Sequence, residues 1–263
     1  MATGVWRLFG AALALALLAG SAEATTFRWG NDGDANSMDP YARQETFLLL
    51  FDQSFYEPLV QWNKDMKLEP ALATEWGQTD PTTWRFKLRQ GVKFHDGTPF
   101  TADDVVFSYD RATHPGSNVA SPLATVKAVN KIDDYTVDFV TDGPDPILPN
   151  NLPTIAIMSK KWCEEHNTTR AADLTKNEES YATRNENGTG PFILVDRQPD
   201  VKTTLKKNPD WWASRTIPSA LTIPCSTGSR MPRPGCRRCC RASSTLSTRC
   251  RRRTPTGSRR RRG

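Results

Sequence analysis

The basic residues of this chain are divided very unevenly, and the division limits which part can form a folded domain. Residues 217–263 hold 13 Arg and no Lys, Asp or Glu, so the net charge of +6 becomes +6 − 13 = −7 over residues 1–216. Five of the six cysteines also lie in this end: Cys225, Cys236, Cys239, Cys240 and Cys250. A segment with one sign of charge and no hydrophobic period is typical of disordered chain. We therefore expect the folded body to end before it.

The N-terminus has the three parts of an export signal. Arg7 supplies the positive charge, residues 8–20 form an apolar run, and Ala22 and Ala24 are small residues of the kind that signal peptidase accepts. The run is shorter than the about 20 apolar residues that cross a bilayer, although an uncleaved anchor is the alternative. We predict cleavage between Ala24 and Thr25 and a mature protein in the periplasm.

Signals for strands and helices alternate irregularly along the body, which indicates a mixed α/β fold. In residues 83–88 the apolar Trp84, Phe86 and Leu88 alternate with basic residues, the pattern of a half-buried strand. Thr101 and Asp104 form a capping box that predicts a helix over residues 101–112. Similar patterns predict strands in 25–32 and 59–62, a hairpin over 126–143 with its turn at 133–134, two strands within 188–212, and helices from residue 45 and within 160–174.

The residues that could carry catalysis or hold a metal are isolated in the sequence. His95-Asp96 has no second ligand nearby at metal-binding spacing, and Asp96-Gly97 is typical of a turn. Cys163 and His166 are a weak signal for a nucleophile and its base, so we interpret Cys163 as a small buried thiol. The sequence predicts no metal site, no cofactor and no catalytic residue.

Several motifs, taken in order, resemble one protein family over residues 25–212. The most specific is "WRFKLRQGVKFHDGTPFTADDVVFSYDRA" at 84–112, and the others keep the family's order and spacing: "SMDP" (37–40), "YEPLVQW" (56–62), "LEPALATEW" (68–76), "GTGPFIL" (188–194) and "KNPDWW" (207–212). This part of the chain resembles the family 5 solute-binding proteins of ABC importers, which include dipeptide-, oligopeptide- and nickel-binding receptors.

The resemblance implies a type II periplasmic-binding-protein-like fold that is incomplete here, with the first lobe and its inserted subdomain. It implies a monomeric receptor without catalysis, which encloses a small solute between two lobes and docks on an ABC permease in the cytoplasmic membrane. The favoured solute is a di- or oligopeptide, although the ligand class stays open. Thr46 and Phe47 match the segment near the cleft, so the resemblance makes them candidate ligand contacts.

A change of reading frame offers an explanation for the basic end. The resemblance stops after Trp212, yet moving the frame one base upstream lets the codons of Arg230 to Thr254 encode "DATARVSALLSGELDLVDPVPPQD", which reads like the family's next helix and strand. We predict a one-base frameshift between Trp212 and Met231. The domains are then a signal peptide (1–24), the N-terminal part of a family 5 domain (25–212) and an out-of-frame, disordered tail (213–263), which makes the product truncated and impaired.

Two other functions remain as alternatives. A secreted hydrolase would need a nucleophile–base pair, and the sequence offers only the weak pair described above. A polyanion-binding protein would use the arginines of the tail, which attract phosphates without sequence specificity. The tail lacks interleaved aromatic residues for base stacking, and the signal peptide directs the chain away from nucleic acid, so we predict no nucleic-acid partner.

Overall fold

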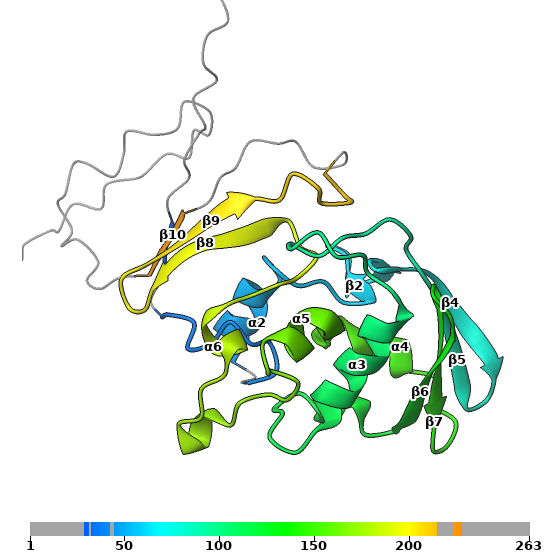
Figure 1. Ribbon diagram of the computed structural model, residues 1–263. Coiled ribbons are helices and arrows are strands. Elements are labelled where there is room, and N and C mark those ends of the chain that lie inside the picture. The colour runs from blue at the N-terminus through cyan, green and yellow to red at the C-terminus, as the bar shows by residue number, and fades with distance from the viewer. Residues whose placement is uncertain (1–28, 32, 43–44, 215–223, 228–263) are drawn as a thin grey trace, which may run out of the picture. The chain divides into compact units, whose positions relative to one another are not determined.

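The computed structural model describes residues 29–31, 33–42, 45–214 and 224–227. The predicted signal peptide, with Ala24 and Thr25, lies outside these ranges, and so do residues 228–263 of the predicted tail. Figure 1 shows helices between two β-sheets, and both sheets have four strands. The mixed α/β architecture predicted from the sequence is therefore confirmed.

The first sheet forms from strands whose side chains alternate as predicted. Its order is β4 (Ala73–Asp80), β5 (Thr83–Leu88), β7 (Thr136–Thr141) and β6 (Val126–Asp133), and every neighbouring pair is antiparallel. Phe86 and Leu88 of β5 are buried, whereas Trp84 is half-buried. On the opposite face Arg85 donates two hydrogen bonds of 2.7 Å to Asp138 of β7. Because β7 is a central strand, Asp138 is buried even though it is polar.

Helix α3 (Ala102–Thr113) covers one face of this sheet. It begins at the predicted capping box, in which the Thr101 N–H donates to Asp104 Oδ2 at 2.9 Å. The helix packs against β6 and β7 on one side and α5 (Lys160–Glu165) on the other. Tyr109 is buried, and its ring contacts Phe139 edge to face at 6.3 Å. The packing of α3 therefore fixes the inner side of the sheet.

The second sheet has the order β1 (Trp29–Asn31), β10 (Pro224–Thr227), β9 (Lys202–Lys207) and β8 (Phe192–Gln198). Strand β10 runs parallel to β1 and antiparallel to β9. The sequence analysis did not indicate β10, which lies within the segment 213–263 for which we predicted no regular structure. Its backbone pairs with two strand edges, and such pairing does not require an alternating hydrophobic pattern. Apart from Ala213 and Ser214, the rest of that segment lies outside the described residues, so the predicted boundary at Trp212 stays a prediction.

The remaining elements are short and lie between the sheets or at their ends. Strands β2 (Val60–Trp62) and β3 (Leu68–Pro70) form an antiparallel hairpin. The other helices are α2 (Thr46–Asp52), α4 (Leu148–Asn151) and α6 (Tyr181–Arg184), with 3₁₀ turns at Ser121–Leu123, Leu152–Thr154 and Leu174–Lys176. In the part of the chain with described coordinates, no helix is long and apolar enough to cross a membrane.

A buried ion pair ties the loop before α2 to helix α3. Arg111 donates to the two carboxylate oxygens of Asp39 at 2.8 and 2.6 Å, and neither side chain is exposed. Arg111 also donates to the backbone carbonyls of Thr168 and Arg170. One guanidinium thus joins three segments that are far apart in sequence, and it fixes the loop that leads into α2.

Candidate functional site

A buried histidine, His95, joins its own turn to the segment that contains Glu186 and Gly190. The Nδ1 atom of His95 lies 2.7 Å from Glu186 Oε2, and its Nε2 atom lies 3.0 Å from the carbonyl oxygen of Gly190. Both side chains are almost fully buried. Asp96 accepts a hydrogen bond from the Thr98 N–H at 2.8 Å, as expected of turn chemistry. The His95-Asp96 pair therefore fixes the turn that contains Gly190.

Two glycines of the "GTGPF" segment lie directly against the backbone of Phe55. A Cβ atom on Gly188 would stand 1.9 Å from the Phe55 carbonyl oxygen, and one on Gly190 would stand 2.6 Å from it. The Gly190 N–H donates to the same oxygen at 2.7 Å. Only glycine allows this approach without a shift of the backbone. The contact fixes the segment that continues from Phe55 to Glu57.

Glu57 is the centre of a buried polar cluster that joins three of the sequence motifs. Its carboxylate accepts hydrogen bonds from Thr189 Oγ1 at 2.8 Å, Trp211 Nε1 at 3.0 Å and Trp212 Nε1 at 2.9 Å. The Arg89 guanidinium lies 3.9 Å from the centre of the Trp212 ring, a cation–π contact. Burial raises the pKa of Glu57, and the three donors oppose this shift. Because every donor is satisfied internally, the cluster supports the site instead of binding a ligand.

An open hollow of about 430 Å³ adjoins this cluster. Trp62 and Met66 from the β2–β3 hairpin line it together with Glu57, Trp211 and Thr154. Trp62 is 40% exposed and Met66 is 72% exposed. A hollow with accessible aromatic and thioether surface and a few polar groups is typical of a ligand-binding face. We therefore take this hollow as the larger part of the candidate site.

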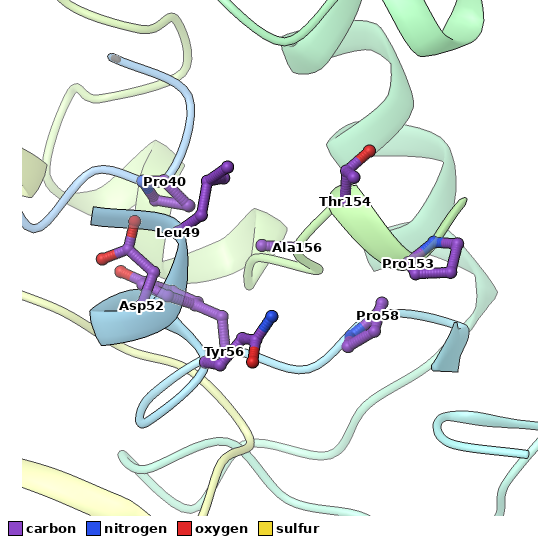
Figure 2. Close-up of a pocket in the computed structure, with 9 residues that line it drawn as sticks. Pro40, Leu49, Asp52, Tyr56, Pro58, Pro153, Thr154 and Ala156 are labelled. Atoms are coloured by element: carbon purple, nitrogen blue, oxygen red, sulfur yellow. The ribbon is translucent and has the colours of Figure 1, made fainter. Parts of the chain in front are cut away.

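A second cavity, of about 90 Å³, shares part of its wall with the larger hollow. The two have five lining residues in common: Gln53, Tyr56, Pro58, Pro153 and Thr154. Figure 2 shows Leu49 and Asp52 on helix α2 on one side of this cavity, with Thr154 and Ala156 across from them. The cavity and the hollow thus belong to one face of the molecule.

Asp52 is the one charged side chain that lines the smaller cavity. It is 4% exposed, and neither of its carboxylate oxygens has a hydrogen-bond partner among the described residues. Burial, and to a smaller extent the neighbouring Asp39, raises the pKa of Asp52 well above its usual value. The electrostatics of Asp52 therefore differ from those of Glu57, whose donors are all supplied by the protein.

The residues predicted as ligand contacts lie on the same helix but in its first turn. Thr46 is exposed, and Phe47 is half-buried with its ring stacked on Phe51 at a centroid distance of 5.8 Å. Neither lines the two cavities, whereas Leu49, Asp52 and Gln53 of the same segment do. Periodicity identified the buried side of α2, but it did not indicate which residues face the segment 153–156.

The candidate nucleophile of the sequence analysis is a buried thiol, as predicted. Cys163 is fully buried, and burial raises its pKa to about 12. A thiol with such a pKa stays protonated near neutral pH and is a weak nucleophile. His166 stacks on the ring of Tyr181 with 4.0 Å between the ring centres. Within the described ranges, no group of three or more His, Cys, Asp or Glu residues is placed to hold a metal ion.

Comparison with known sequences gives one family and several curated relatives. The family described as bacterial extracellular solute-binding proteins, family 5 Middle, matches residues 67–227. The dipeptide-binding protein of Escherichia coli is 30% identical over 242 residues, which is 81% of this chain and 43% of that protein. The heme-binding protein A of Haemophilus influenzae is 30% identical over 194 residues, or 65% of this chain and 34% of that protein. The chain thus spans between 34% and 43% of the length of these two relatives.

Solved structures agree on the fold. The periplasmic binding protein DppA from Helicobacter pylori, in complex with the peptide STSA, matches with a TM-score of 0.66 at 26% identity. The match covers 77% of this chain and 42% of the DppA chain. The substrate-binding domain of an oligopeptide ABC transporter from Bacillus anthracis has a TM-score of 0.67 at 22% identity, which supports the fold alone. The predicted incomplete type II periplasmic-binding-protein fold is confirmed by these similarities.

Proposed function

Because this chain belongs to the family 5 bacterial extracellular solute-binding proteins, we propose that it is the N-terminal part of a periplasmic receptor for peptides. The receptor would deliver its peptide to an ABC permease in the cytoplasmic membrane, after export through the predicted signal peptide. Relatives of the chain include the dipeptide-binding protein of Escherichia coli, and DppA of Helicobacter pylori carries a bound peptide. We also propose that it acts as a monomer and catalyses no reaction.

The observation that carries this proposal is the open face beside the Glu57 cluster. The motifs that match the family converge there, and their polar groups bond to each other instead of pointing into the hollow. Trp62 and Trp211 offer apolar area to the hollow, and the amide side chains of Gln61 and Asn63 also line it, each with one of its two polar atoms engaged within the β2–β3 hairpin. A peptide needs both, because its backbone amides require hydrogen bonds and its side chains require apolar contact.

We further propose that the 263-residue chain alone binds peptides with negligible affinity. In this family, the resemblance implies that the ligand is enclosed between two lobes, and the chain spans less than half the length of its relatives. A ligand held against one open wall keeps most of its surface in water, so little free energy is available to offset its loss of motion. The predicted frameshift between Trp212 and Met231 would account for this state of the chain.

The decisive experiment compares two purified proteins. One is the 263-residue chain, and the other is the product after one base is inserted between the codons of Trp212 and Met231. Titration calorimetry with di- and oligopeptides should give saturable binding only for the second protein. A Trp62→Ala variant of the second protein should bind more weakly, whereas Ile132→Ala, which removes an exposed apolar side chain of β6, should not.

Three results would count against these proposals. Saturable peptide binding by the 263-residue chain would contradict the claim of negligible affinity. Absence of peptide binding by the base-inserted product would contradict the peptide assignment. Sequencing of the locus in independent isolates tests the frameshift, and an unbroken frame that keeps the arginine-rich end in all of them would exclude it.

A further inference from the structure

The carboxylate of Asp52 lies on the same face as the Glu57 cluster, but none of the hydrogen bonds there satisfies it. Among the buried side chains of the described residues, it is the one carboxylate whose two oxygens both lack a hydrogen-bond partner. A buried polar group without a partner destabilises the folded state, and a charged one does so more strongly. Folding alone therefore gives no reason for a carboxylate at this position.

The groups around Asp52 do not neutralise it. Asp39 is the charged group that acts on it, and the carboxylate of Asp39 is itself bound by Arg111. The phenol of Tyr56 lies next to it in the cavity wall, but its O–H donates to the carbonyl oxygen of Met38 at 3.2 Å. No other donor of the described residues forms a hydrogen bond with either Asp52 oxygen. A donor from outside the protein would remove the deficit.

The cavity beside Asp52 has the shape and chemistry to admit such a donor. Its walls are mainly apolar, from Pro40, Leu49 and Pro153, and its volume of about 90 Å³ suits a few heavy atoms. It shares Pro153 and Thr154 with the wall of the larger hollow. Methylene groups fit apolar walls, while a cationic N–H group forms a charge-assisted hydrogen bond with a carboxylate. A metal ion is disfavoured because it would find a single carboxylate here.

We propose that the cavity lined by Asp52 binds an alkylammonium or alkylguanidinium group, with Asp52 as its counter-ion. The group would enter along the apolar wall, and the carboxylate, whose two oxygens each expose less than 1 Å² in this structure, would turn to accept its N–H donors. In a peptide that lies in the larger hollow, a lysine- or arginine-type side chain supplies this group. That last step rests on the proposed peptide function, whereas the cation site itself does not.

The test uses the full 263-residue chain, n-butylammonium chloride and its neutral counterpart 1-butanol. Two-dimensional ¹H–¹⁵N NMR should show saturable shifts at the amides of Leu49, Asp52 and Ala156 with butylammonium, beyond those caused by sodium chloride at equal ionic strength. Butanol should bind at least about tenfold more weakly, since it lacks the charge. The Asp52→Asn variant should lose this preference, whereas Asp65→Asn, at an exposed carboxylate of the β2–β3 hairpin, should keep it.

A pH series gives a second readout that steric effects would not produce. Binding of the cation requires ionised Asp52, so the affinity should rise by up to about tenfold per pH unit while the free carboxyl is protonated. In Asp52→Asn the residual affinity should be independent of pH. The Ala156→Leu variant keeps the carboxylate but fills the cavity, and it should also abolish binding.

Specific outcomes would overturn the site. These are equal binding of butylammonium and butanol, full retention of binding in Asp52→Asn, or shifts that sodium chloride reproduces, which would mean that they come from ionic strength and not from binding. The proposed function fails differently, through absence of peptide binding by the base-inserted protein. If that protein binds peptides but does not prefer lysine- or arginine-containing ones, the peptide arm of this inference fails while the peptide function stands.

Discussion

The buried pair of Arg111 and Asp39 provides the sharpest test of how this lobe is held together. We predict that Arg111→Met destabilises the chain by about 3–5 kcal/mol, the usual cost of breaking a buried ion pair from one side. The substitution removes two hydrogen bonds to Asp39 and those to the carbonyls of Thr168 and Arg170. It also leaves the Asp39 carboxylate without exposure to water and without its counter-ion.

The chain contains a matched control for this experiment. Arg85 makes the same two-bond contact with Asp138, at 2.7 Å for both bonds, but its side chain is 40% exposed. Exposed pairs contribute about 0–1 kcal/mol, because water replaces the lost contact. Arg85→Met should therefore cost several-fold less than Arg111→Met. The difference between the two variants measures the effect of burial together with the two carbonyl contacts that Arg111 makes in addition.

Urea unfolding followed by tryptophan fluorescence measures both variants, with the free energy of unfolding obtained by linear extrapolation. The double variant Asp39→Asn/Arg111→Met should recover a large part of the loss, since no buried charge remains uncompensated. If Arg111→Met costs no more than Arg85→Met, the buried pair does not stabilise this loop. If the double variant is as unstable as the single one, the loss comes from packing and not from the orphaned carboxylate.

Three further predictions follow from other sites. Gly188→Ala should destabilise the chain by about 1–3 kcal/mol in urea unfolding, because its Cβ would overlap the carbonyl of Phe55, whereas Gly143→Ala, which meets open space, should be neutral. Iodoacetamide at mildly alkaline pH should leave the Cys163 peptide unlabelled in mass spectra of the folded chain and label it in urea, since burial raises the pKa of its thiol to about 12. Burial raises the pKa of Asp52, so the folded state keeps a proton that the unfolded chain loses above about pH 4. The free energy of unfolding should fall as the pH rises from about 4 toward the raised pKa of Asp52, by up to about 1.4 kcal/mol per pH unit. Unfolding curves recorded across the pH range should lose this slope in Asp52→Asn.

The helices and strands whose signals lie in a few consecutive residues could be predicted from the sequence. The alternation in residues 83–88 and the capping box at Thr101 identified β5 and the start of α3. The hairpin over 126–143 was also predicted, although its turn lies at Asp134-Tyr135 and not at Asp133-Asp134. The cause is local, because Asp133 accepts a hydrogen bond from the Tyr135 N–H at 2.8 Å and thereby ends β6 one residue later.

The contacts that build the candidate site could not be predicted in this way. Glu186 lies 91 residues from His95, and Trp211 lies 154 residues from Glu57. Sequence patterns indicate which side of an element is apolar, but they do not indicate which distant segment covers it. The ligand contacts expected at Thr46 and Phe47 stay a prediction, and the wall of the cavities contains later residues of the same helix, which no local pattern indicated.

The motifs that carry the family resemblance and the residues that face the cavities have different physical roles in this lobe. The glycines of "GTGPF", the glutamate of "YEPL" and the tryptophans of "NPDWW" satisfy one another and leave few groups for a solute. Asp52 does the reverse, because it lines the cavity and has no partner among the described residues. Substitutions at the two glycines or at Trp212, which do not line the hollow, should therefore change stability and leave ligand preference alone. Substitutions at Asp52 or Trp62 should change ligand preference at little cost in stability, because ligand choice depends on groups that the fold has left unsatisfied or exposed.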